Sequence, residues 1–127
     1  MLKGTLMATG TVLVVDDDPA IIELVETALE DQGYVVLSAV NGAALQVARD
    51  RQPDVILLDI LMPGMDGVEV SQRLRADPAT ASIPIIAMSA QDRLHATFSL
   101  MPVDDRLAKP FELTGLYTTV ARWAQTP

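Results

Sequence analysis

The sequence predicts a single α/β domain: a doubly wound, five-stranded parallel sheet with helices on both faces. Short runs of aliphatic, often β-branched residues alternate along the 127-residue chain with longer stretches whose apolar residues recur at helical spacing. The short runs are apolar almost throughout, as in parallel strands that are covered on both faces. Parallel strands joined through helices form right-handed crossovers, which place helices on both faces of one open sheet.

Five short runs are expected to be the strands. They lie at residues 11–15 (TVLVV), 34–38 (YVVLS), 54–58 (DVILL), 84–88 (PIIAM) and, more weakly, 105–108 (DRLA). Residues 1–10 are expected to be an N-terminal tail, 11–124 the domain, and 125–127 a C-terminal tail. The sequence contains no internal repeat, low-complexity tract or linker that would divide this domain.

The stretches between the strands carry helix signals. The first helix is expected to follow Asp18, which suits an N-cap, with Pro19 at its first position and Gly33 just past its end. Two more helices are expected at 43–51 and 68–76, where the apolar residues have helical spacing.

The last predicted helix has an apolar stripe at offsets of three, four and seven residues, which Trp123 extends. The members of the stripe are Leu113, Leu116, Tyr117 and Val120. A segment at 91–100 has few apolar residues and is soon followed by Pro102, so its helical pattern is weak.

Composition and charge exclude several functions. The chain has 9 Lys and Arg against 17 Asp and Glu, a formal net charge of −8 and an isoelectric point of about 4.3. A basic nucleic-acid footprint is therefore absent, and attraction to an anionic membrane is unsupported. The chain has no cysteine, which excludes disulfides, thiolate metal ligands and thiol nucleophiles and agrees with a reducing compartment.

The first 15 residues are expected to form a tail and a strand rather than a signal peptide. They are mostly uncharged, but they contain no small-residue cleavage site and lead straight into the acidic residues 16–18. No run approaches the roughly 18 apolar residues of a membrane helix. We therefore expect a soluble, cytoplasmic protein without a membrane partner.

Polar residues follow four of the predicted strands. Asp16 and Asp17 follow the first strand, Asp59 the third, Ser89 the fourth and Lys109 the fifth. In open α/β sheets the ligand site lies outside the carboxyl ends of the strands. We therefore expect these side chains to form one site.

Three carboxylates on one rim need a partner of opposite charge. Two unit charges about 4 Å apart repel by roughly 4 kcal/mol at an effective dielectric constant near 20. Carboxylate oxygens, in a chain with one histidine and no cysteine, favour Mg²⁺ or Mn²⁺ over zinc or copper. Mg²⁺ typically binds one or two carboxylates together with phosphate oxygens, so the pattern indicates phosphoryl chemistry. A lysine and a hydroxyl would stabilise the phosphoryl oxygens, and Asp59 could be the acceptor itself.

Four motifs in order resemble the receiver domain of response regulators in two-component signalling, and in particular its chemotaxis-regulator-like members. They are residues 14–19 (VVDDDP), 58–67 (LDILMPGMDG), 88–90 (MSA) and 108–111 (AKPF), and the resemblance extends from about residue 11 to residue 123. It implies a flavodoxin-like sheet with the strand order 2-1-3-4-5.

The resemblance also implies a role for each site residue. Asp59 would accept a phosphoryl group from a phosphohistidine on a sensor histidine kinase or phosphotransfer protein. Asp17 would bind Mg²⁺ directly and Asp16 mainly through water, with Asp59 and the backbone carbonyl of Leu61 as further ligands.

Ser89 and Lys109 would contact the phosphoryl group, and the Lys109–Pro110 peptide bond would be cis. Phosphorylation would draw the Ser89 hydroxyl inward and switch protein–protein interactions. The chain would be a signalling phosphoacceptor with only weak self-phosphorylation and self-dephosphorylation, not an enzyme that acts on an external substrate. Its partners would be a kinase, a downstream protein or fused output domain, and a second copy bound through the fourth helix, fifth strand and fifth helix, without direct nucleic-acid binding.

Several residues in or near these motifs have a more ordinary interpretation than a role in the site. Asp18 is interpreted as a helix cap and not as a ligand. Gly64, Asp66 and Gly67 are typical turn residues that shape the loop beside Asp59 and open the next helix. The single histidine, His95, is expected to face solvent. Only the joint occurrence of the acidic pair, the third-strand aspartate, the serine and the lysine favours a site.

The fifth strand departs from the family pattern. Arg106 stands three positions before Lys109, where the family usually has an aromatic residue that rotates inward with the switch. Burying the arginine would cost free energy unless its charge had a partner, so we expect the aromatic half of the switch to be missing or to be replaced by a salt bridge of Arg106 with Asp104 or Glu112. The spacing from Ser89 to Lys109 is also short for the family, which is expected to trim or distort the fourth helix.

Two other functions stay open. A phosphorylation-independent interaction module would keep the site residues and signal through the altered region around Arg106. A metal-dependent phosphohydrolase of the aspartyl-phosphate type would carry a second aspartate two positions after its nucleophile, where this chain has Leu61.

Overall fold

Strands and helices follow one another along the chain as the sequence predicts. The structure is a computed structural model that describes residues 10–60, 67–90 and 102–124. Within these ranges the strands are β1 (Thr11–Val15), β2 (Val35–Ala39), β3 (Val55–Asp59), β4 (Ile85–Ala90) and β5 (Asp105–Lys109). The helices are α2 (Pro19–Asp31), α3 (Ala43–Arg51), α4 (Gly67–Ala76) and α6 (Leu113–Ala124). The weak helical pattern at 91–100 lies outside the described residues.

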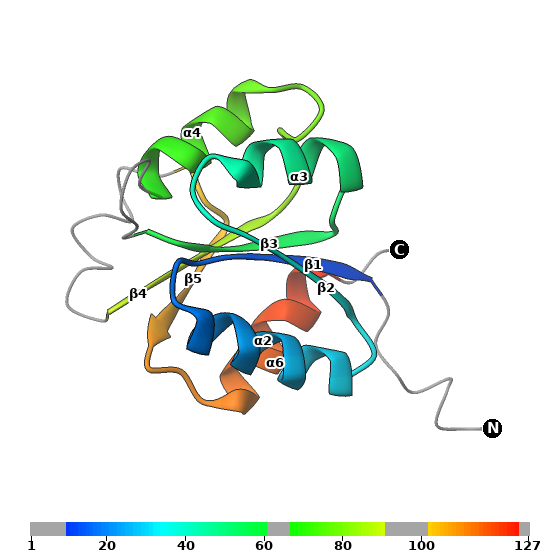
Figure 1. The fold of residues 1–127 in the computed structure, drawn as a ribbon, viewed down its shortest axis with the longest axis vertical. Coiled ribbons are helices and arrows are strands. Elements are labelled where there is room, and N and C mark those ends of the chain that lie inside the picture. The colour runs from blue at the N-terminus through cyan, green and yellow to red at the C-terminus, as the bar shows by residue number, and fades with distance from the viewer. Residues whose placement is uncertain (1–9, 61–66, 91–101, 125–127) are drawn as a thin grey trace.

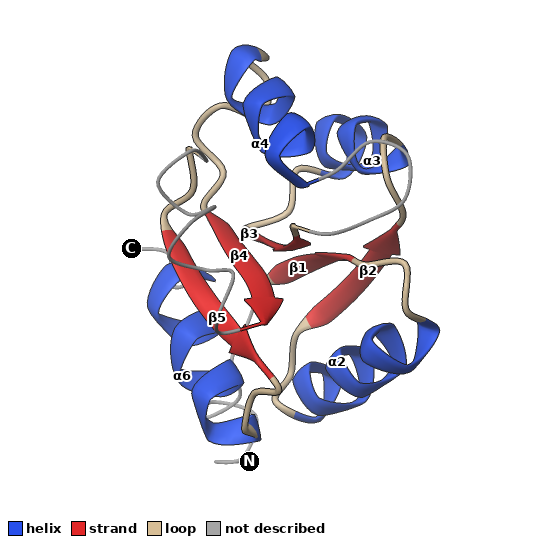
Figure 2. Ribbon diagram, turned by 90° about the vertical axis from the view of Figure 1, so that its left-hand side faces the viewer, coloured by secondary structure: helices blue, strands red, loops and turns tan. Residues whose placement is uncertain are grey.

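The strands form one parallel sheet in the order β2-β1-β3-β4-β5. Helices α3 and α4 lie on one face of this sheet, and α2 and α6 lie on the other (Figure 1). A view turned by 90° about the vertical axis shows the strands between these two helical layers (Figure 2). The predicted fold class and strand order are therefore confirmed. None of the described helices has the length and apolar content needed to cross a membrane.

Alternate strand residues point to opposite faces of the sheet, so it carries two hydrophobic cores. The core beneath α3 and α4 includes Leu13, Val15, Ile56, Leu58, Ala44, Ala48, Val70 and Leu74. The core beneath α2 and α6 includes Val12, Val14, Val55, Leu57, Val25, Leu29, Leu116 and Val120. All five positions of β3 are buried, which explains why this strand is apolar almost throughout in the sequence.

The ends of α2 follow from its sequence. The side chain of Asp18 accepts a hydrogen bond of 2.9 Å from the backbone N–H of Ala20, and Pro19 is the first helical residue. The predicted N-cap is therefore confirmed. After the helix, Gly33 has a φ of 104°, a left-handed conformation that glycine adopts without steric cost.

Four strands extend one or two residues further toward the C-terminus than predicted. Asp59 stays in the ladder opposite Met88, and Lys109 stays opposite Ala90. The predictions ended these strands where apolar residues give way to polar ones, but backbone pairing does not depend on side-chain polarity and continues past that point. At the start of β2 the prediction was early by one residue, because the N–H of Tyr34 donates to the Leu29 carbonyl of α2 instead (3.1 Å).

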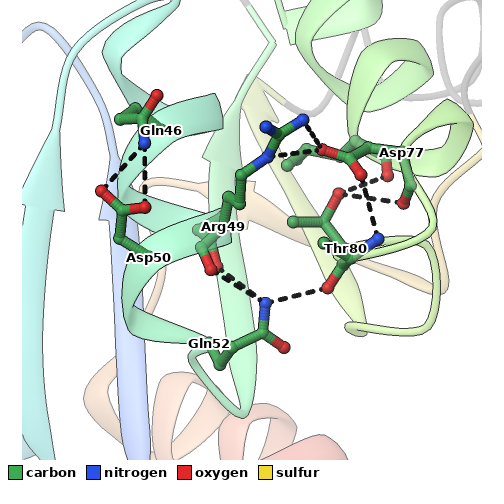
Figure 3. Close-up of polar contacts among 9 residues, drawn as sticks. Gln46, Arg49, Asp50, Gln52, Asp77 and Thr80 are labelled. Atoms are coloured by element: carbon green, nitrogen blue, oxygen red, sulfur yellow. Dashed lines mark hydrogen bonds and ion pairs between the residues drawn. The ribbon is translucent and has the colours of Figure 1, made fainter.

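Polar contacts join α3 to the turn between α4 and β4 (Figure 3). The guanidinium of Arg49 donates to Asp77 through Nε (3.0 Å) and Nη2 (2.6 Å). The amide of Gln52 donates to the Ala79 carbonyl at 2.9 Å, and the buried Thr80 hydroxyl donates to a carbonyl of α4 at 2.6 Å. These contacts lie where α3 and α4 end, and therefore at the edge of the sheet where β3 and β4 begin.

Arg75, in the last turn of α4, ties three segments of the chain together. Its guanidinium donates at 2.7–3.0 Å to three backbone carbonyls, those of Ala81, Ile83 and Pro102. It also pairs with the carboxylate of Asp104, and that carboxylate accepts the N–H of Ile85 at 2.8 Å. The C-terminal end of α4 is thereby fixed to the first residues of β4 and to the segment before β5.

On the other face of the sheet, Asp105 links β5 to α6. Its carboxylate accepts hydrogen bonds from the indole Nε1 of Trp123 (2.7 Å) and from Nη1 of Arg122 (2.9 Å). Burial by itself raises the pKa of Asp105, but the bonds from Trp123, from the Arg106 backbone N–H and from Arg122 outweigh burial and hold that pKa below its ordinary value.

The side chain of Arg106 is exposed, so it does not occupy a buried aromatic position. Asp104, one of its two expected salt-bridge partners, is held by Arg75. The pairing of Asp104 with Arg75 was not predicted from the sequence, because the two residues are 29 positions apart in the chain. The expected salt bridge of Arg106 stays a prediction.

We expect Arg75→Ala to lower the free energy of unfolding by about 2–4 kcal/mol, because it removes a charged donor from several partly buried acceptors. Arg73→Ala is the matched control, since Arg73 forms only an exposed i,i+4 pair with Glu69 among the described residues, and such pairs contribute about 0.5 kcal/mol or less. Urea denaturation of both variants measures the difference. Equal losses would contradict the assigned role of Arg75.

The lowered pKa of Asp105 gives a pH dependence of known sign. A carboxyl group whose pKa is lower in the folded state stabilises the fold fully above its unfolded pKa, about 3.9, and this contribution is lost as pH falls through the folded pKa. We therefore expect Asp105→Asn to be less stable than wild type at neutral pH and to lose less stability on acidification below about pH 4. Urea denaturation followed by far-UV circular dichroism at a series of pH values checks this, and parallel pH curves would refute it.

Candidate functional site

The polar residues singled out in the sequence meet at the carboxyl edge of the sheet. Asp16 and Asp17 directly follow β1, Asp59 ends β3, Ser89 lies near the end of β4 and Lys109 ends β5. All strands are parallel, so these ends meet at one edge. The predicted placement at the strand ends is thus what the structure shows.

Three carboxylates form the centre of this site. One oxygen from each of Asp16, Asp17 and Asp59 lies within 4.8 Å of the others. Asp16 and Asp59 are buried, with 0% and 5% of their surface exposed, while Asp17 is exposed. Asp16 also accepts the backbone N–H of Asp18 at 2.9 Å, which fixes its orientation.

Lys109 brings a positive charge to the two buried carboxylates. Its Nζ lies 2.8 Å from Oδ2 of Asp16 and 3.5 Å from Oδ1 of Asp59. Partial burial lowers the pKa of Lys109, but the hydrogen bond to Asp16 and the charges of Asp59 and Asp16 outweigh burial and raise it. The ammonium therefore stays charged at neutral pH. The Lys109–Pro110 peptide bond is cis, as the resemblance implied.

Ser89 places a buried hydroxyl near the end of β4. The residue is 2% exposed, and its Oγ has no hydrogen-bond partner among the described residues. It follows Met88, which is the β4 partner of Asp59 in the sheet. A buried hydroxyl normally has a partner, so this one is available to a group that enters the site.

The residues present fit a magnesium ion. Three carboxylates and one ammonium leave two negative charges, which a divalent cation balances. The donors are hard oxygens, the ligand type that Mg²⁺ prefers. The Leu61 carbonyl, the remaining predicted ligand, lies outside the described residues, as do Gly64, Asp66 and His95.

One contact at the site was missed by sequence reasoning. Gly67 was interpreted as a turn residue that opens a helix, and it does begin α4. The structure also places it against the backbone of Asp59. The signal was a glycine at the start of a helix only eight positions after the third-strand aspartate, but spacing alone does not show such a contact.

Comparison with known proteins gives consistent matches. A family model for the response regulator receiver domain matches residues 12–121. The chain is 43% identical over 114 residues to the DNA-binding dual master transcriptional regulator RpaA of a Synechocystis species, which covers 86% of this chain and 46% of that protein. The chain thus spans about half the length of curated relatives such as this one.

Solved structures of similar proteins share the fold. The receiver domain of the sensor histidine kinase PA1611 from Pseudomonas aeruginosa, with a magnesium ion in its active site cleft, has a TM-score of 0.85 and 30% identity over 94% of this chain and 100% of its own. The chemotaxis protein CheY4 of Vibrio cholerae has a TM-score of 0.80 and 31% identity over 91% of this chain and 99% of its own.

The hydroxyl of Ser89 gives a stability prediction. Ser89→Ala removes a buried polar group that makes no hydrogen bond to any described residue, so we expect the free energy of unfolding to stay constant or to rise by up to about 1 kcal/mol. Thr80→Val is the control, because the Thr80 hydroxyl donates to the Leu74 carbonyl and its loss should cost about 1–2 kcal/mol. Urea denaturation compares the two, and an equal loss in both variants would show that Ser89 has a partner.

Proposed function

The chain belongs to the family of response regulator receiver domains, and from this membership we propose that Asp59 is its phosphoacceptor. Receiver domains act as signalling phosphoacceptors in two-component systems. The observation that carries the assignment to Asp59 is its position. It is a buried carboxylate at the end of the central strand, beside two further carboxylates and within 3.5 Å of the Lys109 ammonium.

The reaction is transfer of a phosphoryl group from a phosphohistidine. A carboxylate oxygen of Asp59 attacks phosphorus, an O–P bond forms, and the N–P bond breaks. The electron pair of that bond returns to the imidazole nitrogen, which then takes up a proton. Lys109, which lies beside Asp59, and the hydroxyl of Ser89, which has no partner among the described residues, would donate to the phosphoryl oxygens as charge develops on them, and such preorganised donors stabilise the transition state.

Asp16, Asp17 and Asp59, with the backbone carbonyl of Leu61, are the residues that would hold Mg²⁺, for which Mn²⁺ is a substitute. When bound, the ion supplies neutralising charge to the phosphoryl oxygens. The ammonium of Lys109 already neutralises part of the carboxylate charge. Without the ion, two unbalanced charges would repel an incoming phosphoryl group.

The switch follows from the same groups. Phosphorylation would give the Ser89 hydroxyl an acceptor, which the described part of the chain does not supply. In the sheet Ser89 lies opposite Ala108, and Ala90 lies opposite Lys109, so movement of Ser89 acts directly on the end of β5. Arg106, which also lies on β5, is exposed. The surface that would change on phosphorylation therefore differs from the family pattern at this position.

The partners follow the family. A sensor histidine kinase or a phosphotransfer protein would supply the phosphoryl group, and a downstream protein or a fused output domain would respond. RpaA is named as a DNA-binding protein, but the net charge of −8 argues against direct nucleic-acid binding by this chain. A homodimer would use β5, α6 and the predicted helix at 91–100, and a cytoplasmic setting fits this signalling role.

Phosphorylation at Asp59 is tested with acetyl phosphate and Mg²⁺. We expect a mass increase of one phosphoryl group on wild type, none on Asp59→Asn, and none after magnesium is removed with a chelator. Asp50→Asn is the control, since this exposed carboxylate lies on α3 and binds Gln46; it should be modified like wild type. An equal adduct on wild type and Asp59→Asn would overturn the assignment.

A further inference from the structure

The first residue of α4 touches the backbone of the proposed phosphoacceptor. A Cβ built on Gly67 would lie 2.4 Å from Cα of Ile60 and 2.6 Å from the carbonyl oxygen of Asp59. The Gly67 N–H also donates to the Ile60 carbonyl at 3.2 Å. No side chain fits at this position unless the main chain on one side moves.

The same stretch of main chain is also held by β4, its neighbour within the sheet. The N–H of Ile60 donates to the Met88 carbonyl at 3.1 Å, and Asp59 lies opposite Met88 in the ladder. The peptide unit between Asp59 and Ile60 is therefore in contact both with β4, within the sheet, and with the start of α4. Its position determines where the carboxylate of Asp59 lies relative to Lys109.

Helix α4 is not free to move back from this contact. Val70 and Leu74 are 0% and 1% exposed and belong to the core beneath α3 and α4. The next residue, Arg75, fixes the far end of the helix to Asp104 and to three backbone carbonyls. A side chain at position 67 would thus displace the peptide unit of Asp59 rather than the helix.

We propose that Gly67 is a positioning residue for phosphoryl transfer: its missing side chain lets α4 fix the backbone of Asp59 at the place where the carboxylate meets Lys109 and the other acidic groups. The proposal rests on the role of Asp59 as phosphoacceptor. It gives Gly67 a function beyond opening a helix, because the contact reaches the reacting residue itself. A displacement of about 1 Å at such a site can slow a reaction by about a hundredfold.

The test compares Gly67→Ala with Gly115→Ala. Gly115 lies within α6, and among the described residues a Cβ there would meet only the Leu107 side chain, at 4.0 Å, an ordinary contact. Both variants add the same methyl group to a helix, where alanine is favoured over glycine. Three quantities are measured: the amide ¹H and ¹⁵N shifts without magnesium, the dissociation constant for Mg²⁺ by calorimetry, and the rate of phosphorylation by acetyl phosphate.

For Gly67→Ala we expect shifted amide signals of Asp59 and Ile60, several-fold weaker Mg²⁺ binding, and phosphorylation slowed by about tenfold or more. For Gly115→Ala we expect wild-type values for all three and a higher urea midpoint. The double variant tests Gly67→Ala in the more stable background. If Gly67→Ala keeps wild-type Mg²⁺ binding and rate, or is unfolded in both backgrounds, the positioning role is overturned and Gly67 is a structural glycine only.

The two proposals fail in different ways. If wild type is not phosphorylated at Asp59, the proposed function fails, but the amide signals of Asp59 and Ile60 still report whether Gly67 positions this backbone. If wild type is phosphorylated and those signals stay unchanged in Gly67→Ala, the positioning role alone fails.

Discussion

Charge balance at one edge of the sheet is the constraint on which the site depends. Asp16 and Asp59 are buried with like charges, an arrangement that costs free energy unless a cation is close. Lys109 supplies that cation, although it is 93 residues from Asp16 in the chain. The contact exists only because parallel pairing brings the ends of β1, β3 and β5 to the same edge. The fold thus determines the electrostatics of the site.

The rest of the architecture supports this edge from a distance. The two hydrophobic cores fix the sheet from both faces, and the contacts of Arg75 and Asp105 fix the start of β5. The hydroxyl of Ser89, in contrast, has no partner among the described residues. Within the described residues, side-chain contacts thus link the helices to the edge where the strands begin, while the opposite edge holds a buried hydroxyl without a partner.

Much of this could be predicted from sequence because the signals are local. Uniformly apolar runs predicted the strands, and Asp18 before Pro19 predicted the start of α2. Polar residues after successive strands predicted a common site, because the carboxyl ends of parallel strands lie at the same edge of the sheet. Contacts between distant segments could not be predicted. The pairing of Asp104 with Arg75 and the contact of Gly67 with the backbone of Asp59 depend on how α4 packs, and no local residue pattern predicts this packing. The ligand roles of Asp16, Asp17, Asp59 and Leu61 stay predictions.

The two adjacent acidic residues at the start of β5 have a mechanical consequence. Asp104 is held by a helix on one face of the sheet and Asp105 by a helix on the other, so this edge strand is anchored from both layers at its first residues. Among the described residues β5 pairs with a strand on one side only, and these two side chains add contacts from both helical layers. The register of β5 against β4 is therefore fixed at its first residues, and Lys109 at its other end pairs with Asp16 and Asp59.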